Sequence, residues 1–513
     1  MTDTEATTPA ARSAVPRGST VAVVGTGTMG QGIAQVALVA GHPVLLYDAA
    51  PGRAEAAATA VLDRLDRLVA KGRLAQDARD SAASRLRPAA VLDELADAAL
   101  VVEAIVERLD VKQELFAALE KTVAEDCLLA TNTSSLSVTA VAGALRHPGR
   151  FVGMHFFNPA PLLPLVEIVS GFATDEAAAT RAYDTADAWG KTPVRCADTP
   201  GFIVNRVARP FYAEAFRVHE ERGADPATID AVLRECGGFR MGAFELTDLI
   251  GQDVNEAVTR SVWESFFQDP KFAPSLAQRR LVESGRLGRK TGHGWYPHGE
   301  GDERPGPHTA PPADPPAHVT VRGDLGPAEP LVELIEQAGI EVRRRTGDGW
   351  IDLPSDGRLC LADGETSAEY GDDQIIYFDL ALDYASARRV ALSTCDTTAP
   401  EALSEAVGLF QAIGKQVSVI GDVPGMIVAR TVAMLVDVAV DAVDRGVATA
   451  EDVDTAMRLG VNYPLGPLAW GEKVGYARVA GLLKEMHKRY PTGRYAPALG
   501  TVRRGYAEDA RID

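Results

Sequence analysis

One histidine and one glutamate between Phe151 and Gly171 are each flanked by apolar residues. His155 lies in FVGMHFF and Glu167 in PLVEIV, with a proline-rich turn between them. Two strands joined by that turn could bring the side chains together. A carboxylate that accepts from one imidazole nitrogen leaves the other nitrogen as a base, which removal of a hydroxyl proton requires. The same spacing also fits a structural histidine in the core that is hydrogen-bonded to a buried carboxylate. The spacing alone does not distinguish a catalytic pair from a structural one.

Two polar segments are candidates to complete such a site. NTSSL (Asn132–Leu136) follows the apolar run CLLAT, at the carboxyl edge of a predicted parallel sheet, where ligands of such sheets bind. Ser134 or Ser135 could hydrogen-bond a substrate oxygen, although serine is equally common as a helix N-cap. Asn205, in the otherwise apolar GFIVNRV, could serve similarly or be satisfied by its neighbours.

A glycine-rich turn near the start of the chain has the dinucleotide-binding pattern GxGxxG. It follows the strand-like run TVAVVG and opens a helix-like run, and it consists of Gly25, Thr26, Gly27, Thr28, Met29 and Gly30. The pyrophosphate of a dinucleotide would lie at the helix N-terminus, where free N–H groups favour negative charge. Asp48 ends the next strand about 20 residues on, where an acidic residue binds the ribose hydroxyls. Its charge repels the extra phosphate of NADP, so the sequence predicts NAD.

Alternating apolar strands and amphipathic helices predict the fold class. From Thr20 to Thr199 they indicate a Rossmann-type α/β domain, with a parallel sheet covered on both faces. Apolar residues at helical spacing from Pro200 to Tyr296 predict an all-helical domain. His298–Ala317 is dense in Pro and Gly and predicts a linker.

The second half of the chain repeats the first in a degenerate form. PGFIVNR at Pro200 is echoed by PGMIVAR at Pro424, and GKTPVRCADTPG by GKQVSVIGDVPG. The run HVTVRGDLGPAEPLVELIEQAGIEV keeps the strand–turn–helix–strand order but lacks GxGxxG, and Arg343–Arg345 follow where an acidic residue would close the strand. The predicted divisions are a disordered tail (1–18), an NAD-binding Rossmann domain (19–199), a helical domain (200–297), the linker (298–317), a Rossmann-like domain without cofactor (318–422) and a second helical domain (423–513).

Composition excludes several classes of function. The formal net charge of −19 argues against a nucleic-acid partner, because phosphate-backbone binding needs a basic surface. The five cysteines form no CxxC pair, which indicates neither a zinc site nor a disulfide framework. No apolar run approaches the ~18 residues of a membrane span, and no signal peptide is recognisable, so a cytoplasmic protein is expected.

These motifs together resemble the 3-hydroxyacyl-CoA dehydrogenase family. The matching segments are GTGTMGQGIA, VVEAIVE, NTSSL, HFFNP, PGFIVNR and LGRKTGHGWY, in family order over the first ~300 residues. The family oxidises a (3S)-3-hydroxyacyl-CoA to the 3-ketoacyl-CoA. The resemblance implies that His155 and Glu167 are its catalytic pair and that Ser134 and Asn205 contact the substrate. It also implies a nicotinamide-nucleotide site lined by Glu107, Lys112, Asn158 and Lys290.

The anionic coenzyme A would need a local basic patch. Arg64, Arg67 and Lys71 lie on one face of a predicted helix, and Lys71 matches a CoA-contacting lysine of the family. A merely solvated helix face is the alternative for Arg64 and Arg67.

The two-half arrangement resembles the longer bacterial dehydrogenases of phenylacetate breakdown, which act on 3-hydroxyadipyl-CoA. In the second half Ala429 replaces the asparagine, and VALSTCDTT is expected where the histidine segment would be. That half is therefore expected to be inactive. Helical domains of this family commonly dimerise, so either a homo-oligomer or an internal pseudo-dimer is implied. The alternatives are a short-chain 3-hydroxybutyryl-CoA dehydrogenase and, more remotely, a non-catalytic NAD-binding scaffold.

Overall fold

The computed structural model describes residues 13–371 and 374–512, and the chain forms two compact units. The first unit extends to Ile203 and also includes Gly446–Gly460, and the second consists of Val204–Arg445 and the chain from Val461 onward. Of the predicted tail 1–18, residues 1–12 lie outside the described residues. In its remainder Val15 is only 3% exposed, and its N–H donates to the Thr185 hydroxyl at 2.9 Å.

The first unit is built on an eight-stranded sheet with strand order β3-β2-β1-β4-β5-β6-β7-β8. Every neighbouring pair is parallel except β6 and β7, which are antiparallel. The reversal of strand order between β1 and β4 is the point at which Rossmann sheets bind dinucleotides. The strands are β1 (Val21–Val24), β2 (Val44–Tyr47), β3 (Leu86–Ala89), β4 (Leu100–Glu103), β5 (Leu128–Thr131), β6 (Phe151–Phe156), β7 (Leu165–Ser170) and β8 (Thr192–Ala197).

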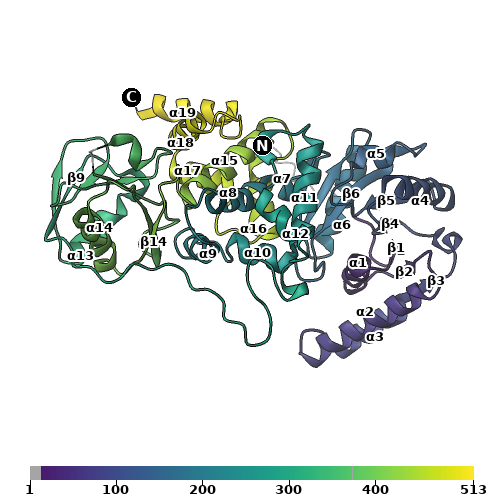
Figure 1. Cartoon of the computed structure of the whole chain (residues 1–513). Helices are drawn as coiled ribbons and strands as arrows, with labels where there is room; N and C mark the ends of the chain where they lie inside the picture. The colour runs from purple at the N-terminus through teal and green to yellow at the C-terminus, as the bar shows by residue number, and fades with distance from the viewer. Residues whose placement is uncertain (1–12, 372–373, 513) are drawn as a thin grey trace, which may run out of the picture. The chain divides into compact units, whose positions relative to one another are not determined.

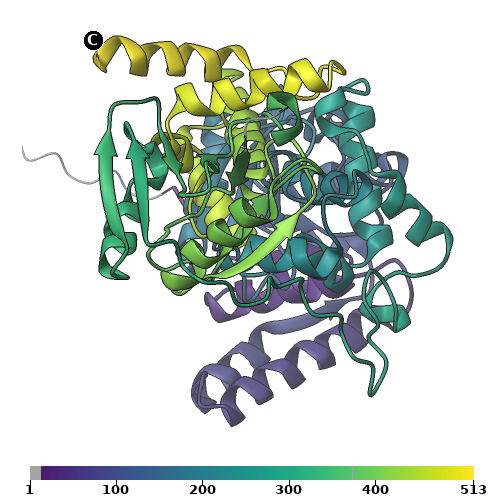
Figure 2. The same ribbon diagram turned by 60° about the vertical axis from the view of Figure 1, so that its left-hand side comes forward.

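Helices cover this sheet because its central strands are buried on both faces. All residues of β1, β4 and β5 are buried, as the continuous apolar runs predict. Helices α2 and α3 lie side by side (Figures 1 and 2). The helices are α1 (Thr28–Val39), α2 (Arg53–Ala70), α3 (Gln76–Arg85), α4 (Leu109–Thr122), α5 (Val138–Ala142), α6 (Glu176–Ala188) and α16 (Ala450–Gly460).

The edge strand β8 is covered by a segment from far along the chain. The Ala197 N–H donates to the Val447 carbonyl at 2.8 Å, and α16 packs against β7 and β8. An edge strand presents unpaired backbone groups, so this contact protects the sheet from pairing with another chain. The degenerate half thus completes the first unit.

The second unit contains the helices of both halves. Helix α15 packs on α8, and it is buried around nearly its whole circumference, as expected for a central helix. Helices α18 and α19 lie side by side in both ribbon views (Figures 1 and 2). The helices are α7 (Val204–Val207), α8 (Arg209–Glu220), α9 (Pro226–Glu235), α10 (Ala243–Ile250), α11 (Gln252–Ser265), α12 (Leu276–Glu283), α15 (Val428–Asp444), α17 (Pro467–Val474), α18 (Tyr476–Arg489) and α19 (Leu499–Ile512).

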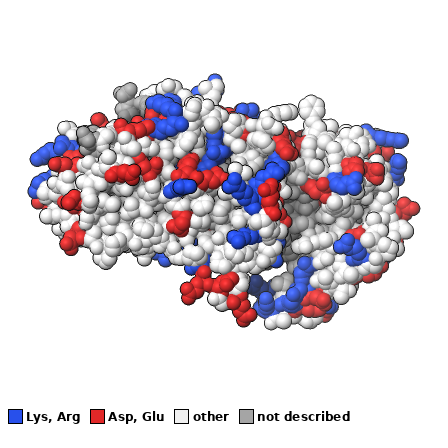
Figure 3. Space-filling view, in the orientation of Figure 1, with Lys and Arg blue, Asp and Glu red and all other residues white. Residues whose placement is uncertain are grey.

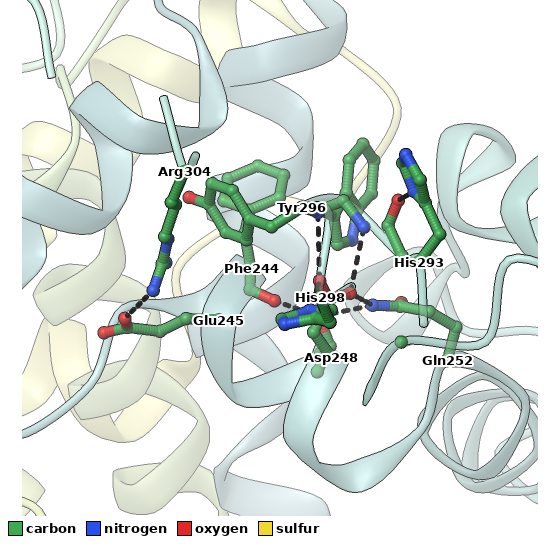
Figure 4. Close-up of polar contacts among 12 residues, drawn as sticks. Phe244, Glu245, Asp248, Gln252, His293, Tyr296, His298 and Arg304 are labelled. Atoms are coloured by element: carbon green, nitrogen blue, oxygen red, sulfur yellow. Dashed lines mark hydrogen bonds and ion pairs between the residues drawn. The ribbon is translucent and has the colours of Figure 1, made fainter. Parts of the chain in front are cut away.

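A buried carboxylate fixes the chain that follows α12 onto these helices (Figure 4). Asp248 on α10 accepts a hydrogen bond from the Tyr296 N–H at 3.0 Å and contacts His298 Nε2 at 2.8 Å. Farther along, the Arg304 guanidinium lies 3.0 Å from Glu245, also on α10. The start of the predicted linker is therefore held by specific polar contacts.

A seven-stranded sheet with order β10-β9-β11-β12-β13-β14-β15 confirms the degenerate Rossmann-like repeat. Strands β9 and β10 are parallel and joined through α13, as β1 and β2 are joined through α1. The next strand differs: β11 is antiparallel to both of its neighbours, whereas β4, which has the same place in the first sheet, is parallel to both of its neighbours. The elements are β9 (His318–Arg322), β10 (Glu341–Arg345), β11 (Trp350–Asp352), β12 (Arg358–Leu361), β13 (Ile375–Phe378), β14 (Arg389–Ser393), β15 (Gln416–Ile420), α13 (Pro330–Gln337) and α14 (Pro400–Ala412).

The backbone of the repeated motif supports the duplication directly. Gly201 and Phe202 have φ angles of 74° and 48°, and Gly425 and Met426 have φ angles of 70° and 52°. Left-handed backbone at a Phe or a Met is rare, because the Cβ atom clashes there. The same unusual turn therefore precedes α7 and α15.

Strand register corrects the predicted counterpart of the histidine segment. Gly153 on β6 faces Val169 on β7, and Tyr377 on β13 faces Ser393 on β14, with one constant offset between the two sheets. The residues VALS therefore lie in β14, the counterpart of the glutamate strand, so the prediction that this segment takes the place of the histidine segment was wrong. The same offset leads from His155 to Asp379.

Candidate active site

His155 and Glu167 face each other across the antiparallel pair β6–β7. His155 Nδ1 lies 2.6 Å from Glu167 Oε2, and the two residues are 5% and 0% exposed. The other glutamate oxygen, Oε1, accepts a hydrogen bond from the Ile203 N–H at 3.1 Å. The carboxylate is thus fixed from both sides and orients the imidazole.

Aromatic rings enclose the imidazole of His155. Phe157 and Phe202 have ring centroids 4.5 Å and 5.7 Å from it. Because Nδ1 is engaged by Glu167, Nε2 is the ring nitrogen that remains for proton transfer. This arrangement can accept a proton and hold the resulting imidazolium beside a buried anion.

The glycine turn has the shape that a dinucleotide needs. A Cβ on Gly30 would stand 1.8 Å from the Gly25 carbonyl oxygen, so only glycine allows the helix to pack this closely. A Cβ on Gly27 would meet nothing within 4 Å, and Gly27 caps α1 without a side-chain hydrogen bond. The N–H groups at this helix end are therefore available to an anion.

Asp48 directly follows β2 and lies beside the turn. Its Oδ2 accepts from the Thr26 hydroxyl at 2.6 Å and the Thr26 N–H at 3.1 Å, and its Oδ1 accepts from Ala50. Burial opposes ionisation of Asp48, but these hydrogen bonds outweigh it and hold its pKa below the usual range. Asp48 also lines a cavity of about 710 Å³ together with Gly25, Gly27, Arg53, Ile105 and Leu115.

Replacing Asp48 with Ala should change the choice of cofactor. Loss of charge-assisted hydrogen bonds costs about 1.5–3 kcal/mol, so kcat/KM for NAD should fall roughly 10-fold to 100-fold. Activity with NADP should rise relative to NAD, because the repelling charge is gone. Steady-state rates with both cofactors measure this, with Asp48→Asn as the control that keeps the side-chain shape. An unchanged NAD-to-NADP ratio in Asp48→Ala would argue against the assignment.

A buried lysine joins two glutamates at the carboxyl ends of the strands. Lys112 Nζ lies 2.5 Å from Glu103 Oε1 and 3.2 Å from Glu107 Oε2, and Lys112 is 1% exposed. The Thr131 hydroxyl donates to the other oxygen of Glu103 at 2.6 Å. Sequence reasoning named Glu107 and Lys112 but missed Glu103. The sequence did contain a signal for it: Glu103 ends the apolar run LVVE, and Glu107 follows four residues later.

The serine turn after β5 wraps around Glu107. The Ser134 N–H donates to Glu107 Oε1 at 3.0 Å, and the Thr133 and Ser135 hydroxyls donate at 2.6 Å and 2.9 Å. Burial opposes ionisation of Glu107, but Lys112 and these hydrogen bonds hold its pKa below the usual range. The N-cap of α5 is Ser137, so the capping role considered for Ser134 is wrong.

The expected coenzyme A residues lie on α2 and at its end. Lys71 is exposed, whereas Arg64 is half-buried and donates to Gln31 Oε1 at 2.6 Å. Arg64 is therefore not part of a freely solvated face. On the molecular face shown in Figure 3, lysine and arginine side chains are interspersed with acidic ones despite the net charge of −19.

The remaining predicted residues are distributed over both units. Asn158 is exposed just after β6. Asn205 is half-buried on α7 and comes two residues after Ile203 in the chain. Lys290 is exposed in the second unit and forms an ion pair with Asp253 at 2.5 Å. Among the described residues, no acidic, histidine and cysteine cluster could hold a metal ion, and no helix is long and apolar enough to cross a membrane.

Known proteins resemble the chain over half to nearly all of its length. A protein of Escherichia coli (strain K12) named 3-hydroxyadipyl-CoA dehydrogenase is 44% identical over 93% of this chain and 95% of its own length. A crystal structure described as 3-hydroxybutyryl-CoA dehydrogenase from Escherichia coli K12 is 41% identical, with a TM-score of 0.88 over 97% of this chain and 100% of that one. The mitochondrial hydroxyacyl-coenzyme A dehydrogenase of Sus scrofa is 41% identical over 54% of this chain and 90% of its own length.

Family models account for both halves. The NAD binding domain of 3-hydroxyacyl-CoA dehydrogenase matches residues 20–199, and the C-terminal domain matches residues 201–298 and again 425–507. The reduced Rossmann-fold domain of 3-hydroxybutyryl-CoA dehydrogenase matches residues 359–424. Together with the dinucleotide turn and the buried His–Glu pair, these matches show that the chain is an NAD-dependent oxidoreductase belonging to the 3-hydroxyacyl-CoA dehydrogenase family.

Proposed function

We propose that the chain oxidises 3-hydroxyadipyl-CoA to 3-oxoadipyl-CoA with NAD, as a step of phenylacetate degradation. The observation that carries the chemistry is the buried contact of 2.6 Å between His155 and Glu167. The adipyl substrate is supported by the name of the Escherichia coli relative, which matches 93% of this chain. Because NAD and acyl-CoA are metabolites of the cell interior, a cytoplasmic location goes with this proposal.

In the proposed mechanism, His155 Nε2 takes the proton of the 3-hydroxyl group. Glu167 keeps the imidazole oriented and stabilises the imidazolium, and the Ile203 N–H keeps Glu167 in place. Bound NAD supplies the acceptor for the hydride that leaves C3. Aromatic residues around His155 exclude water, which strengthens the His–Glu interaction.

The other site residues position the two ligands. Ser134 and Asn205 hold the reacting oxygen and the thioester. The turn from Gly25 to Gly30 and Asp48 bind the pyrophosphate and the ribose, and Lys71 and Arg64 lie on the coenzyme A side. The nicotinamide end of the cofactor is assigned to Glu107, Lys112, Ser134, Asn158 and Lys290.

The second half is inferred to be inactive. Its counterpart of His155 is Asp379, whose backbone N–H pairs with Ala391, the counterpart of Glu167. The Asp379 carboxylate accepts from the N–H groups of Ile427, Val428 and Ala429, as Glu167 accepts from Ile203. Burial raises the pKa of Asp379 to about 6 despite these contacts. In the second half, Asp379 therefore stands in the place of the base His155, and its carboxylate is hydrogen-bonded to the N-terminal end of α15. This supports the proposed division into an active and an inactive pair of domains.

The substrate assignment is tested by kinetics on two acyl chains. We expect kcat/KM for 3-hydroxyadipyl-CoA to exceed that for 3-hydroxybutyryl-CoA by about tenfold or more, since a charge-assisted contact contributes about 1.5–3 kcal/mol. The alternative, a short-chain 3-hydroxybutyryl-CoA dehydrogenase, is supported by the description of the structural relative. A clear preference for the butyryl substrate would establish that alternative instead.

A further inference from the structure

Arg209 differs from the other buried arginines of the second unit in its partners. Five arginines of the described residues are buried, with exposures between 0% and 5%, and four of them contact a carboxylate. Those four pairs are Arg206 with Asp441 at 2.7 Å, Arg389 with Glu235 at 3.0 Å, Arg430 with Glu214 at 3.1 Å, and Arg494 with Glu214. Arg209, 5% exposed at the start of α8, has no carboxylate partner among the described residues.

The immediate surroundings of Arg209 are polar but uncharged. Its Nη1 donates to the Thr259 hydroxyl at 3.0 Å, and its guanidinium lies 5.0 Å from the ring centre of Tyr212. Its Nε is buried without a hydrogen-bond partner among the described residues, and so is the hydroxyl of Tyr463, which interacts electrostatically with Arg209. A buried cation without a counter-ion is strongly unfavourable, so an anion bound beside Arg209 would be stabilised.

The position of Arg209 in the chain indicates which anion. Arg209 follows Asn205 by four residues, and the Ala208 N–H donates to the Val204 carbonyl at 3.0 Å, as in a helical turn. Asn205 on α7 and Arg209 at the start of α8 are therefore about one helical turn apart along the chain, roughly 6 Å. Asn205 is assigned to the reacting part of the substrate. In 3-hydroxyadipyl-CoA, C3 and the C6 carboxyl carbon are joined by bonds of about 1.5 Å each, a span of under about 5 Å.

We propose that Arg209, together with the hydroxyl of Tyr463, binds the terminal carboxylate of a dicarboxylic 3-hydroxyacyl-CoA. This inference rests on the proposed function, because it assigns the group that selects the adipyl chain. The guanidinium presents a planar fork of donors that matches a carboxylate, and a phenol hydroxyl adds one donor.

The same proposal gives the inactive half a role. Tyr463 belongs to that half, in the segment GVNYPLG, and Asn462 before it has a φ angle of 56°, an uncommon backbone conformation outside glycine. By the offset between the two halves, the counterpart of Arg209 is Ala433 on α15, so only the first helical domain carries the cation. The degenerate half contributes to substrate selection where it no longer contributes to catalysis.

The test compares two substrates of equal chain length, 3-hydroxyadipyl-CoA and 3-hydroxyhexanoyl-CoA, in the full chain. Arg209→Met should lower kcat/KM for the adipyl substrate about 100-fold, because truncating one partner of a buried charge pair is costly. Activity on the hexanoyl substrate should be retained or rise. Tyr463→Phe should lower only the adipyl value, by about tenfold. Arg279→Met, which removes an exposed arginine paired with Glu283 at 2.7 Å, is the matched control and should change neither value.

The outcomes separate this inference from the proposed function. A wild-type chain that does not prefer the adipyl over the hexanoyl substrate overturns the proposed function itself. A wild-type preference that survives Arg209→Met, or an equal loss on both substrates, overturns the role of Arg209. If Arg209→Met does not fold, Tyr463→Phe provides the test. A loss of kcat/KM on the adipyl substrate alone supports the carboxylate site, and an equal effect on both substrates overturns it.

Discussion

Replacing His155 with Ala should lower kcat for NADH formation by about 10³-fold to 10⁴-fold. General-base catalysis by a positioned histidine accounts for up to about this factor. No other ring nitrogen can substitute within the β6–β7 pair, because Glu167 faces His155 directly and holds only that imidazole. The rate is followed by the absorbance of NADH at saturating substrate. His147→Ala, at an exposed histidine of the same unit, should leave kcat unchanged.

A double-variant cycle distinguishes a catalytic pair from a structural contact. Glu167→Gln keeps the shape of the side chain but removes the anion beside His155, so kcat should fall by a smaller factor than in His155→Ala. Residues that act as one unit have non-additive effects, so the double variant should be no slower than His155→Ala alone. Additive losses in the double variant, or a normal kcat in His155→Ala, would contradict the proposed mechanism.

The elements around this site could be predicted because their signals are local. A glycine turn between a strand and a helix fixes its own geometry, and the Cβ clash at Gly30 shows why the pattern is strict. The pairing of His155 with Glu167 could be anticipated because a short turn between two strands sets an antiparallel register. Asp48 lies at the end of β2, beside the turn, as the spacing predicted.

The degenerate half was harder to predict, because its strands no longer carry the residues that mark register. Strand β13 is IIYF and strand β11 is reversed, so the match of residue types put VALST in the place of the histidine strand instead of the glutamate strand. The backbone pairing of β13 with β14, including Asp379 with Ala391, shows the true correspondence. Strands β13 and β14 are both fully buried runs, so the apolar pattern does not distinguish one from the other, which is why the sequence did not reveal the correspondence.

Arg209 shows a second limit of sequence reasoning. Its segment, NRVARPF, is like any start of an amphipathic helix, and arginine is usually exposed. What singles it out is burial without a carboxylate among the described residues, together with its electrostatic interaction with Tyr463 from the other half of the chain. The spacing of residues within one segment does not predict a contact with a residue far along the chain.

Glu214 joins the helical domains of the two halves. It is fully buried on α8, in the first half, and its Oε1 accepts from Arg494 Nε at 3.0 Å. Its Oε2 accepts from Arg430 Nε at 3.1 Å and from the Tyr495 hydroxyl at 2.8 Å. All three partners belong to the second half. We propose that this contact forms an internal pseudo-dimer in place of the dimer implied by the family resemblance.

Replacing Glu214 with Gln should therefore destabilise the second unit by about 3–5 kcal/mol, because two buried guanidinium groups lose their common anion. Denaturant unfolding followed by circular dichroism measures this loss. The matched control is Glu221→Gln. The Glu221 side chain is 24% exposed and lies 2.9 Å from Arg430, so its replacement should cost only about 1 kcal/mol. Equal effects of the two substitutions would show that the buried network does not hold the domains together.

The pH dependence of this difference follows from the state of Glu214. Burial opposes its ionisation, but Arg494 and Arg430 outweigh burial and hold its pKa below the usual range. A carboxyl with a lowered pKa contributes stability that is fully present above its unfolded-state value of about 4.3 and is lost as the pH falls through the folded-state value. The free energy of unfolding of the wild-type chain should therefore approach that of Glu214→Gln below about pH 4. A difference that stays constant from neutral to acidic pH would mean that the charge of Glu214 does not stabilise the pair of helical domains.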